Sequence, residues 1–235
     1  MIGATRARSL RSRGDDPLLA PREEIDMTYS SDIAFTPTIK SIQTREGSRR
    51  AYARMEEEHS WRTSLTPDIV AFIAQQTSVF LATANREMQP YIQHRGGPAG
   101  FLKTLDETTI GFADFSGNRQ YVTIGNLADN PKAYLFLIDY SRRRRVKIWG
   151  TARVMEDDAE LIARLTPADY AARVERAILF SVLALDVNCP SHIPQRFEAS
   201  DVAAALAERD ARIAALEAQV QELRASAGQG AVIAI

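Results

Sequence analysis

Short runs of alternating apolar and polar residues fill the middle of the chain, which is the pattern of half-buried β-strands. Polar or glycine-bearing breaks separate the runs, at spacings of about 8–20 residues that are typical of an antiparallel barrel or sandwich. The expected strands cover residues 78–84, 90–95, 101–105, 109–115, 133–140, 146–154 and 177–187.

Helix signals flank these strands. Thr66 followed by Pro67 is a good helix start, with a threonine N-cap and a proline at the first helical position, and predicts a helix over 67–75. Further short helices are expected near residues 52–59, 120–128 and 157–164. The sequence therefore predicts a mainly β (α+β) fold with flanking helices.

The C-terminal part has a different pattern. Residues 201–225 are rich in Ala, Glu, Arg and Leu and contain no Gly or Pro, which predicts an amphipathic helix of about seven turns. Its large apolar residues follow heptad-like steps, interrupted by Arg209: Leu206, Ile213, Leu216, Val220 and Leu223. Because this helix is too long for packing on a small barrel alone, we expect a short dimeric coiled coil or a helix lying across a partner subunit.

The termini carry little patterning. We expect residues 1–34 to be a disordered or extended arm, 35–198 to be the strand-rich domain, 199–225 the helix and 226–235 a tail. Residues 1–14 are basic and free of acids, and residues 15–35 read as a linker. No secretory signal and no apolar run of about 18 residues is visible, and there is one cysteine, so we expect a cytoplasmic protein without a membrane span.

Composition excludes several classes of site. A single cysteine rules out an internal disulfide framework, and three histidines without HxH or HExxH spacing predict no metal site. There is no P-loop, GxGxxG or GxSxG motif. Cys189 and His192 could form a nucleophilic pair, or simply belong to a packed loop. The net charge of −1 disfavours nucleic-acid binding, which would have to use the basic N-terminus and the arginines at 142–145.

Although the net charge of the whole chain is close to zero, one segment of it carries an excess of positive charge. Residues 91–150 hold nine basic and five acidic side chains, and only four of the 29 basic residues in the chain are lysines. Arg95 precedes Gly96 and Gly97, and Arg119 follows Gly117 and Asn118. Loops of this kind can hold a phosphate with guanidinium groups and backbone N–H groups, although a surface turn with a solvated arginine has the same sequence.

A second cationic feature follows the arginines at 142–145, whose simplest interpretation is a solvated hairpin tip. In the expected strand, Arg145, Lys147 and Trp149 alternate with apolar residues and therefore share one face. Two cations beside an indole suit an anionic aromatic ligand.

Three long segments now identify a family: YIQHRGGPAGFLKTLD, then GFADFSGNRQYVTIGNLADNPKAYLFLIDYSRRRRVKIWGTARV, then LDVNCPSHIPQRF. They closely resemble the pyridoxamine 5′-phosphate oxidase-like FMN-binding proteins, and the resemblance runs from about residue 35 to about residue 224. It implies an antiparallel split β-barrel that works as a homodimer, with two FMN molecules in clefts at the subunit interface.

The resemblance also implies site residues. The FMN phosphate would be bound at Arg95, with Gly97 in the same segment, and by the loop Asn118, Arg119 and Gln120. The isoalloxazine and ribityl groups would lie near Gln93, His94, Phe112, Ala113 and Asp114. The second subunit would contribute Arg144, Arg145, Lys147 and Trp149.

The chain departs from the true oxidase in two places. Gly-Gly-Pro follows Arg95 where that enzyme has an apolar run ending in lysine, and its C-terminal Arg/His substrate motif is absent. The resemblance therefore implies an FMN-dependent oxidoreductase acting on an unidentified small molecule or a nicotinamide donor, with no evident acid–base residue; His94 could equally be structural. The alternatives are a deazaflavin enzyme and a non-catalytic flavin- or haem-binding redox or storage module.

Overall fold

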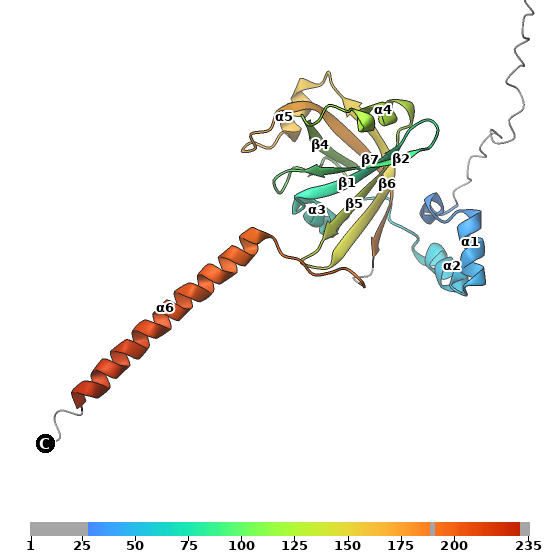
Figure 1. The fold of residues 1–235 in the computed structure, drawn as a ribbon. Coiled ribbons are helices and arrows are strands. Elements are labelled where there is room, and N and C mark those ends of the chain that lie inside the picture. Colours follow the sequence, from blue (N-terminus) through green and yellow to red (C-terminus); the bar gives the residue numbers. More distant parts are fainter. Residues whose placement is uncertain (1–27, 189–190, 231–235) are drawn as a thin grey trace, which may run out of the picture.

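The computed structural model describes residues 28–188 and 191–230, and its centre is one antiparallel sheet that curls into a split barrel (Figure 1). The seven strands follow the order β2-β1-β5-β6-β7-β4-β3, which confirms the predicted fold class. Their bounds are β1 Ser78–Ala84, β2 Pro90–Gly96, β3 Lys103–Thr104, β4 Thr109–Phe115, β5 Lys132–Asp139, β6 Arg144–Met155 and β7 Val174–Asn188.

The strands match their predicted positions except at β3. A strand was expected over 101–105, but Phe101 and Leu102 are buried in the core from a turn in which the Phe101 N–H donates to the Pro98 carbonyl at 2.9 Å. Only two residues remain to pair with β4. The strand expected over 101–105 is therefore wrong at 101 and 102, which contribute to the core from a turn instead.

The barrel interior is filled from alternate positions of the strands. Val79, Leu81, Phe112, Ile148 and Phe180 are all almost fully buried in one cluster. Helix α3 (Pro67–Ala74) adds Ile69, Phe72 and Ile73 to the same cluster, close to its predicted bounds. Burial of the 21 residues of this cluster is the main force that holds the barrel together.

Gly150 marks a close approach between the two longest strands. A Cβ atom at this position would lie 2.1 Å from the Ser181 carbonyl oxygen, so only glycine fits. The β6–β7 register shifts between Trp149 and Gly150, which is where a bulge lets the strands bend around the barrel.

Three N-terminal elements pack beside the barrel: η2 (Ser30–Ile33), α1 (Pro37–Arg45) and α2 (Arg49–Glu58). The helix expected near 52–59 is confirmed as α2, but the linker interpretation of 15–35 is wrong at Ser30–Ile33, and α1 was not predicted. The remainder of the predicted arm, residues 1–27, lies outside the described part of the chain.

Charged side chains join these elements. Lys40 Nζ lies 2.6 Å from Asp32 Oδ1 and 3.4 Å from Glu56 Oε1, and Arg49 also pairs with Glu56. Asp32 and Glu56 are buried. Because this interface is built on ion pairs, it leaves no apolar stripe in the sequence for a periodicity argument to find.

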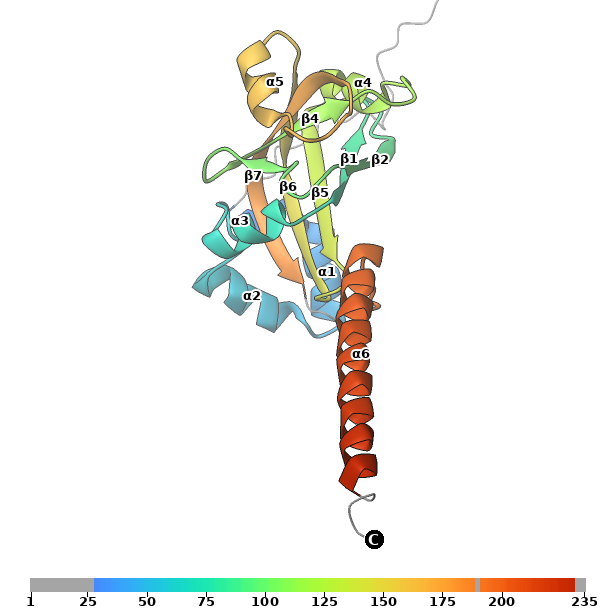
Figure 2. The same cartoon turned by 90° about the vertical axis from the view of Figure 1, so that its left-hand side faces the viewer.

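The other helices are α4 (Val122–Asp129), α5 (Ala159–Leu165) and α6 (Ala199–Gly230), all near their predicted positions. Helix α6 leaves the end of the barrel opposite α4 and α5 and projects as a rod (Figures 1 and 2). Among the described residues, none of the helices is both long enough and apolar enough to cross a bilayer.

Candidate functional site

A cavity of about 240 Å³ opens where β2 and β4 come together, beside the start of α4. We call it the Arg119 cavity. The two strands lie far apart in the sheet order, so closure of the barrel is what makes them neighbours. The cavity gathers five of the residues singled out from the sequence: Gln93, Arg95, Asp114, Asn118 and Arg119.

An ion pair between Arg95 and Asp114 joins β2 to β4 across this closure. Arg176 lies opposite Asp114 on β7, with its Nε atom 3.5 Å from Asp114 Oδ2. All three side chains are largely buried: Arg95 is 15% exposed, Asp114 7% and Arg176 12%. The Nε atoms of Arg95 and Arg176 are buried and have no hydrogen-bond partner.

The charge of the cavity depends on Asp114. Two guanidinium groups in the lining, Arg95 and Arg119, face two carboxylates, Asp114 and Glu175. Burial raises the pKa of Asp114, although Arg95 and Arg176 act in the opposite direction. Arg176 is further engaged by Glu156 at 2.6 Å and Glu175 at 3.0 Å. The cavity therefore gains positive charge when Asp114 takes up a proton, and Arg119 is its most accessible cation.

The loop that carries Arg119 has a constrained backbone. Arg119 and Tyr121 have φ angles of 59° and 55°, in the left-handed region that non-glycine residues seldom adopt. The Arg119 Nε atom donates to the Tyr121 hydroxyl at 3.1 Å, and the Gln120 N–H donates to the Asn118 side chain at 3.2 Å. No side chain caps α4, so the first N–H groups of that helix are available to an anion.

Helix α4 is held against β2 and β1 by side-chain hydrogen bonds. The Thr123 hydroxyl donates to Gln93 Oε1 at 2.7 Å, and Asn126 Nδ2 donates to the Thr83 hydroxyl at 3.0 Å. Accepting the bond from Thr123 leaves the Gln93 amide group to donate elsewhere. The arrangement fixes the helix start beside the cavity.

A separate surface carries the residues that the resemblance assigned to the second subunit. We call Arg145, Lys147 and Trp149 the β6 face. Lys147 Nζ lies 3.0 Å from Asp186 Oδ2, and the ring of Trp61 stacks on Trp149 with centroids 4.6 Å apart. Lys147 and Trp149 thus already have an anion and an aromatic ring of the same chain as partners.

Arg144 is similarly engaged, with its Nη2 atom 3.0 Å from Asp68 Oδ2 and its guanidinium 4.8 Å from the centre of the Phe72 ring. None of Arg144, Arg145, Lys147 and Trp149 lines the Arg119 cavity. Arg145 Nε is buried and has no hydrogen-bond partner.

The remaining predicted residues do not present side chains to the cavity. Phe112 and Ala113 are 1% and 4% exposed, and Phe112 belongs to the barrel core. Gly97 packs so closely on Phe101 that a Cβ atom would lie 2.7 Å from its side chain. His94 alternates with Gln93 and Arg95 and so lies on the outer face of β2, with its ring 5.5 Å from that of Phe80. Gln120 is exposed on the loop.

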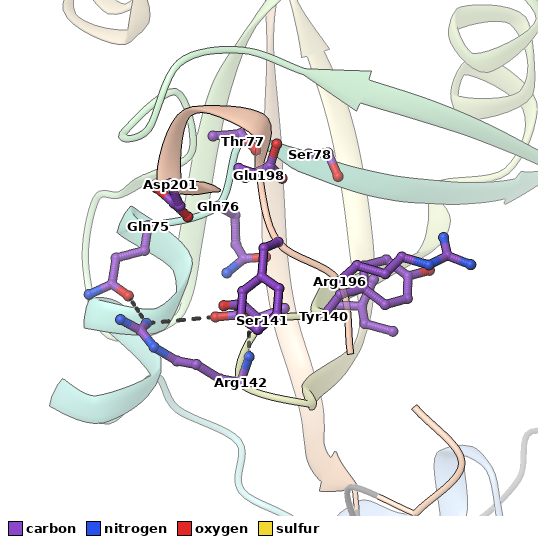
Figure 3. Close-up of a pocket in the computed structure, with 13 residues that line it drawn as sticks. Gln75, Gln76, Thr77, Ser78, Tyr140, Ser141, Arg142, Arg196, Glu198 and Asp201 are labelled. Atoms are coloured by element: carbon purple, nitrogen blue, oxygen red, sulfur yellow. Dashed lines mark hydrogen bonds and ion pairs between the residues drawn. The ribbon is translucent and has the colours of Figure 1, made fainter. Parts of the chain in front are cut away.

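Two larger cavities lie elsewhere. One of about 550 Å³ lies between the start of β1, the β5–β6 turn and the start of α6 (Figure 3). Its two arginines already have partners: Arg142 pairs with Gln75 and Asp139, and Arg196 lies 4.8 Å from the centre of the Tyr140 ring. The other, of about 410 Å³, is lined by residues that include Met55, His59 and Trp61.

The proposed Cys189–His192 pair has no structural account, because Cys189 lies outside the described residues, while His192 is exposed. Within the described part of the chain, no group of three or more His, Cys, Asp or Glu side chains is placed to hold a metal ion.

Sequence reasoning missed Thr123, Tyr121, Glu175 and Arg176. Arg176 reaches the site only because β7 pairs with β4 in a register that places it opposite Asp114. Asp114 and Arg176 are more than 60 positions apart in the sequence, and no local pattern predicts the register in which their strands pair. Thr123 offered a weak signal, since it lies one turn after the Arg119 loop at a predicted helix start.

Comparison with known proteins decides the family. The family model described as pyridoxamine 5′-phosphate oxidase matches residues 65–189, more than half of the chain. The chain belongs to the pyridoxamine 5′-phosphate oxidase family. The match covers the barrel from just before α3 to the end of β7, including every predicted site residue. A search of curated proteins gives no match.

Several solved structures are similar to this chain at low sequence identity. HupZ of Group A Streptococcus is 20% identical, covering 56% of this chain and 98% of its own, with a TM-score of 0.43. A putative pyridoxamine 5′-phosphate oxidase of Lactobacillus delbrueckii is 21% identical, covering 53% and 95%, with a TM-score of 0.41. An FMN-binding protein of Syntrophomonas wolfei is 15% identical, covering 62% and 97%, with a TM-score of 0.42.

Proposed function

We propose that this family member is an FMN-dependent oxidoreductase that works as a homodimer on a small molecule. The observation that carries the proposal is the Arg119 cavity, in which Gln93, Arg95, Asn118 and Arg119 meet at the uncapped start of α4. Guanidinium groups, a side-chain amide and free backbone N–H groups are the donors that a phosphate monoester needs.

The residues present fit the phosphate end of FMN. Arg119 and the N–H groups at the start of α4 would bind the phosphate, and Arg95 would add charge from the cavity wall. The buried Nε atom of Arg95 is a donor for which the described residues supply no acceptor, whereas that of Arg176 lies 3.5 Å from Asp114 Oδ2. Gln93 would donate through its amide to the ribityl or ring part. The bound flavin would supply the redox chemistry, and the protein its position and surroundings.

The size of the cavity supports the homodimer. At about 240 Å³ it is smaller than the roughly 300–1,000 Å³ of typical small-molecule sites. A second copy would complete the walls around the ring system. The outer face of β2, β1 and β5 suits such a contact, because Ile92 is 60% exposed beside the aromatic side chains of Phe80, His94 and Phe136. We leave Arg144, Arg145, Lys147 and Trp149 out of the proposed contacts.

The first test is the identity of the bound molecule. Purified protein should show flavin absorbance in the blue and near-UV, and mass spectrometry of the released molecule should give FMN. Addition of a nicotinamide donor without oxygen should bleach the flavin, and a suitable acceptor should restore its absorbance. Release of a deazaflavin would replace FMN in the proposal, and a colourless protein that binds no added flavin would refute it.

A second candidate is a non-catalytic flavin- or haem-binding module of the same fold. The lining of the Arg119 cavity does not separate the two candidates, because Asp114, Glu175 and Tyr121 are side chains that can move a proton. For haem, an axial ligand is required, and His59 in the 410 Å³ cavity is a side chain of the right type. Bound flavin that no donor reduces would favour a flavin module. A Soret band that is lost in His59→Ala would favour haem.

A further inference from the structure

Helix α6 is a long helix that no other described part of the chain covers. It covers Ala199–Gly230, and all its side chains from residue 199 to 226 are exposed. Six large apolar residues on it are between 42% and 70% exposed: Val202, Leu206, Ile213, Leu216, Val220 and Leu223. A helix of this length in water gains most of its stability from burying such a stripe against another surface.

The stripe follows a heptad repeat across four heptads. With Leu206 at position a, the other a positions hold Ala199, Ile213 and Val220, and the d positions hold Val202, Arg209, Leu216 and Leu223. Ile or Val at a with Leu at d, as in the C-terminal half, is the combination that favours two parallel strands. The exposed surface therefore has the pattern of one half of a parallel two-stranded coiled coil.

We propose that α6 pairs in parallel and in register with α6 of a second copy of this chain. The charges agree with that register. Arg212 at position g would face Glu217 at the following e position of the other helix, so that each coil contains this attractive pair twice. None of the ion pairs in the described part of the chain uses Arg212 or Glu217, which leaves both side chains available.

Arg209 is the polar position of the seam. In the parallel register it lies opposite Arg209 of the other helix and beside Asp210 of that helix, whose carboxylate at the neighbouring e position offsets the like charge. A shift by one heptad would place one Arg209 against Val202 and beside Ala203, where it has no carboxylate, and the other against Leu216 and beside Glu217, so that one of the two charge pairs would be lost. A single polar seam residue of this kind costs stability and fixes the register.

The base of α6 is attached to the barrel. Gln195 Nε2 donates to the Ser141 carbonyl at 2.9 Å, and Arg143 Nε donates to the Ile193 carbonyl at 3.2 Å. Arg196 lies over Tyr140 beside these contacts (Figure 3). A parallel coil would therefore hold two barrels at the same end of the assembly. The α6 pairing does not rest on flavin binding, because the Arg119 cavity lies at the opposite end of the barrel beside α4.

Disulfide trapping in the full chain tests the orientation. In a Cys189→Ser background, Leu223→Cys should give a crosslinked dimer under mild oxidation, because equivalent d positions meet in a parallel coil. Ala218→Cys at the outward f position is the control and should remain uncrosslinked. In an antiparallel pair the two residues at 223 would lie roughly 30 Å apart, so crosslinking no greater than in the control would overturn the proposal.

A charge swap tests the register. Arg212→Glu should weaken the coil and lower the thermal midpoint of its helical signal by a few degrees, because like charges would then meet at positions 212 and 217. Adding Glu217→Arg to the same chain should restore the midpoint. Equal midpoints in all three proteins would contradict the pairing, whereas flavin content should not change in any of them.

Discussion

The Arg119 cavity and the β6 face were two similar cationic features in the sequence, and the fold treats them differently. In the cavity, Arg119 contacts a tyrosine hydroxyl and forms no ion pair with any described residue, although Arg95 beside it is paired with Asp114. On the β6 face, Asp186 pairs with Lys147 and Trp61 covers Trp149. A cationic side chain is available to bind an anion where no acidic side chain of the same chain is paired with it, as at Arg119. Where the chain supplies an acid and an aromatic ring of its own, as at Lys147 and Trp149, the same residue types stabilise the fold instead.

Removal of the ring that covers the β6 face should have the largest effect. Trp61→Ala should lower the free energy of unfolding by about 2–3 kcal/mol, because it loses a stacked aromatic pair and leaves Trp149 in water. Denaturant unfolding measures this, with Trp61→Phe as the milder control. FMN affinity should stay within about twofold of the wild-type value; a clear gain in affinity would mean that the β6 face is a flavin site blocked by Trp61.

Removal of the accessible cation in the cavity should come next. Arg119→Ala should weaken FMN binding by about tenfold to a hundredfold, the equivalent of one or two charge-assisted hydrogen bonds. Fluorescence titration of the apoprotein measures it. Arg224→Ala removes an exposed arginine of α6 and is the matched control. The same affinity in both variants would exclude a phosphate role for Arg119.

The pH dependence of stability that arises from Asp114, in the Arg119 cavity, should be a smaller effect. Burial places the pKa of Asp114 above 3.8 in the folded protein, so the folded state holds this proton more tightly than the unfolded state. Stability from Asp114 is then fully present below pH 3.8 and declines as the pH rises through the folded-state value. The difference in unfolding free energy between wild type and Asp114→Asn should show this decline. A difference that instead moves in favour of the wild type as the pH rises would mean that the two arginines outweigh burial.

The smallest effect on flavin is expected on the β6 face itself. Lys147→Met removes the partner of Asp186 and should cost about 1 kcal/mol of stability, since both side chains are 24% exposed. FMN affinity should change by less than about twofold. If Lys147→Met lowered FMN affinity as much as Arg119→Ala does, both regions would contribute to flavin binding, and the distinction between them would be wrong.

Sequence patterns predicted the barrel well because its core is built from apolar residues at strand and helix spacing. Of the N-terminal elements, η2 and α1 were missed for the opposite reason, since Asp32 and Lys40 are joined by charge to each other and, through Lys40, to Glu56 of α2. Helix α1 did carry a readable start signal, Thr36 followed by Pro37, of the same kind that located α3.

The site was predictable only in part. Local sequence placed Arg95 and Arg119 at glycine-bearing loops, and the family resemblance joined them. The contributions of Arg176 and Thr123 depend on strand register and helix packing, which long-range contacts decide. The covering of Trp149 by Trp61 likewise joins residues that are 88 positions apart, and no local pattern marks it.

The central claim is that the Arg119 cavity recognises a phosphate group. The most direct measurement is the affinity of the apoprotein for FMN compared with riboflavin, which lacks only the phosphate. We predict that FMN binds about a hundredfold more tightly and that Arg119→Ala removes most of this difference while leaving riboflavin affinity unchanged. Equal affinities for FMN and riboflavin in the wild-type protein would contradict the account.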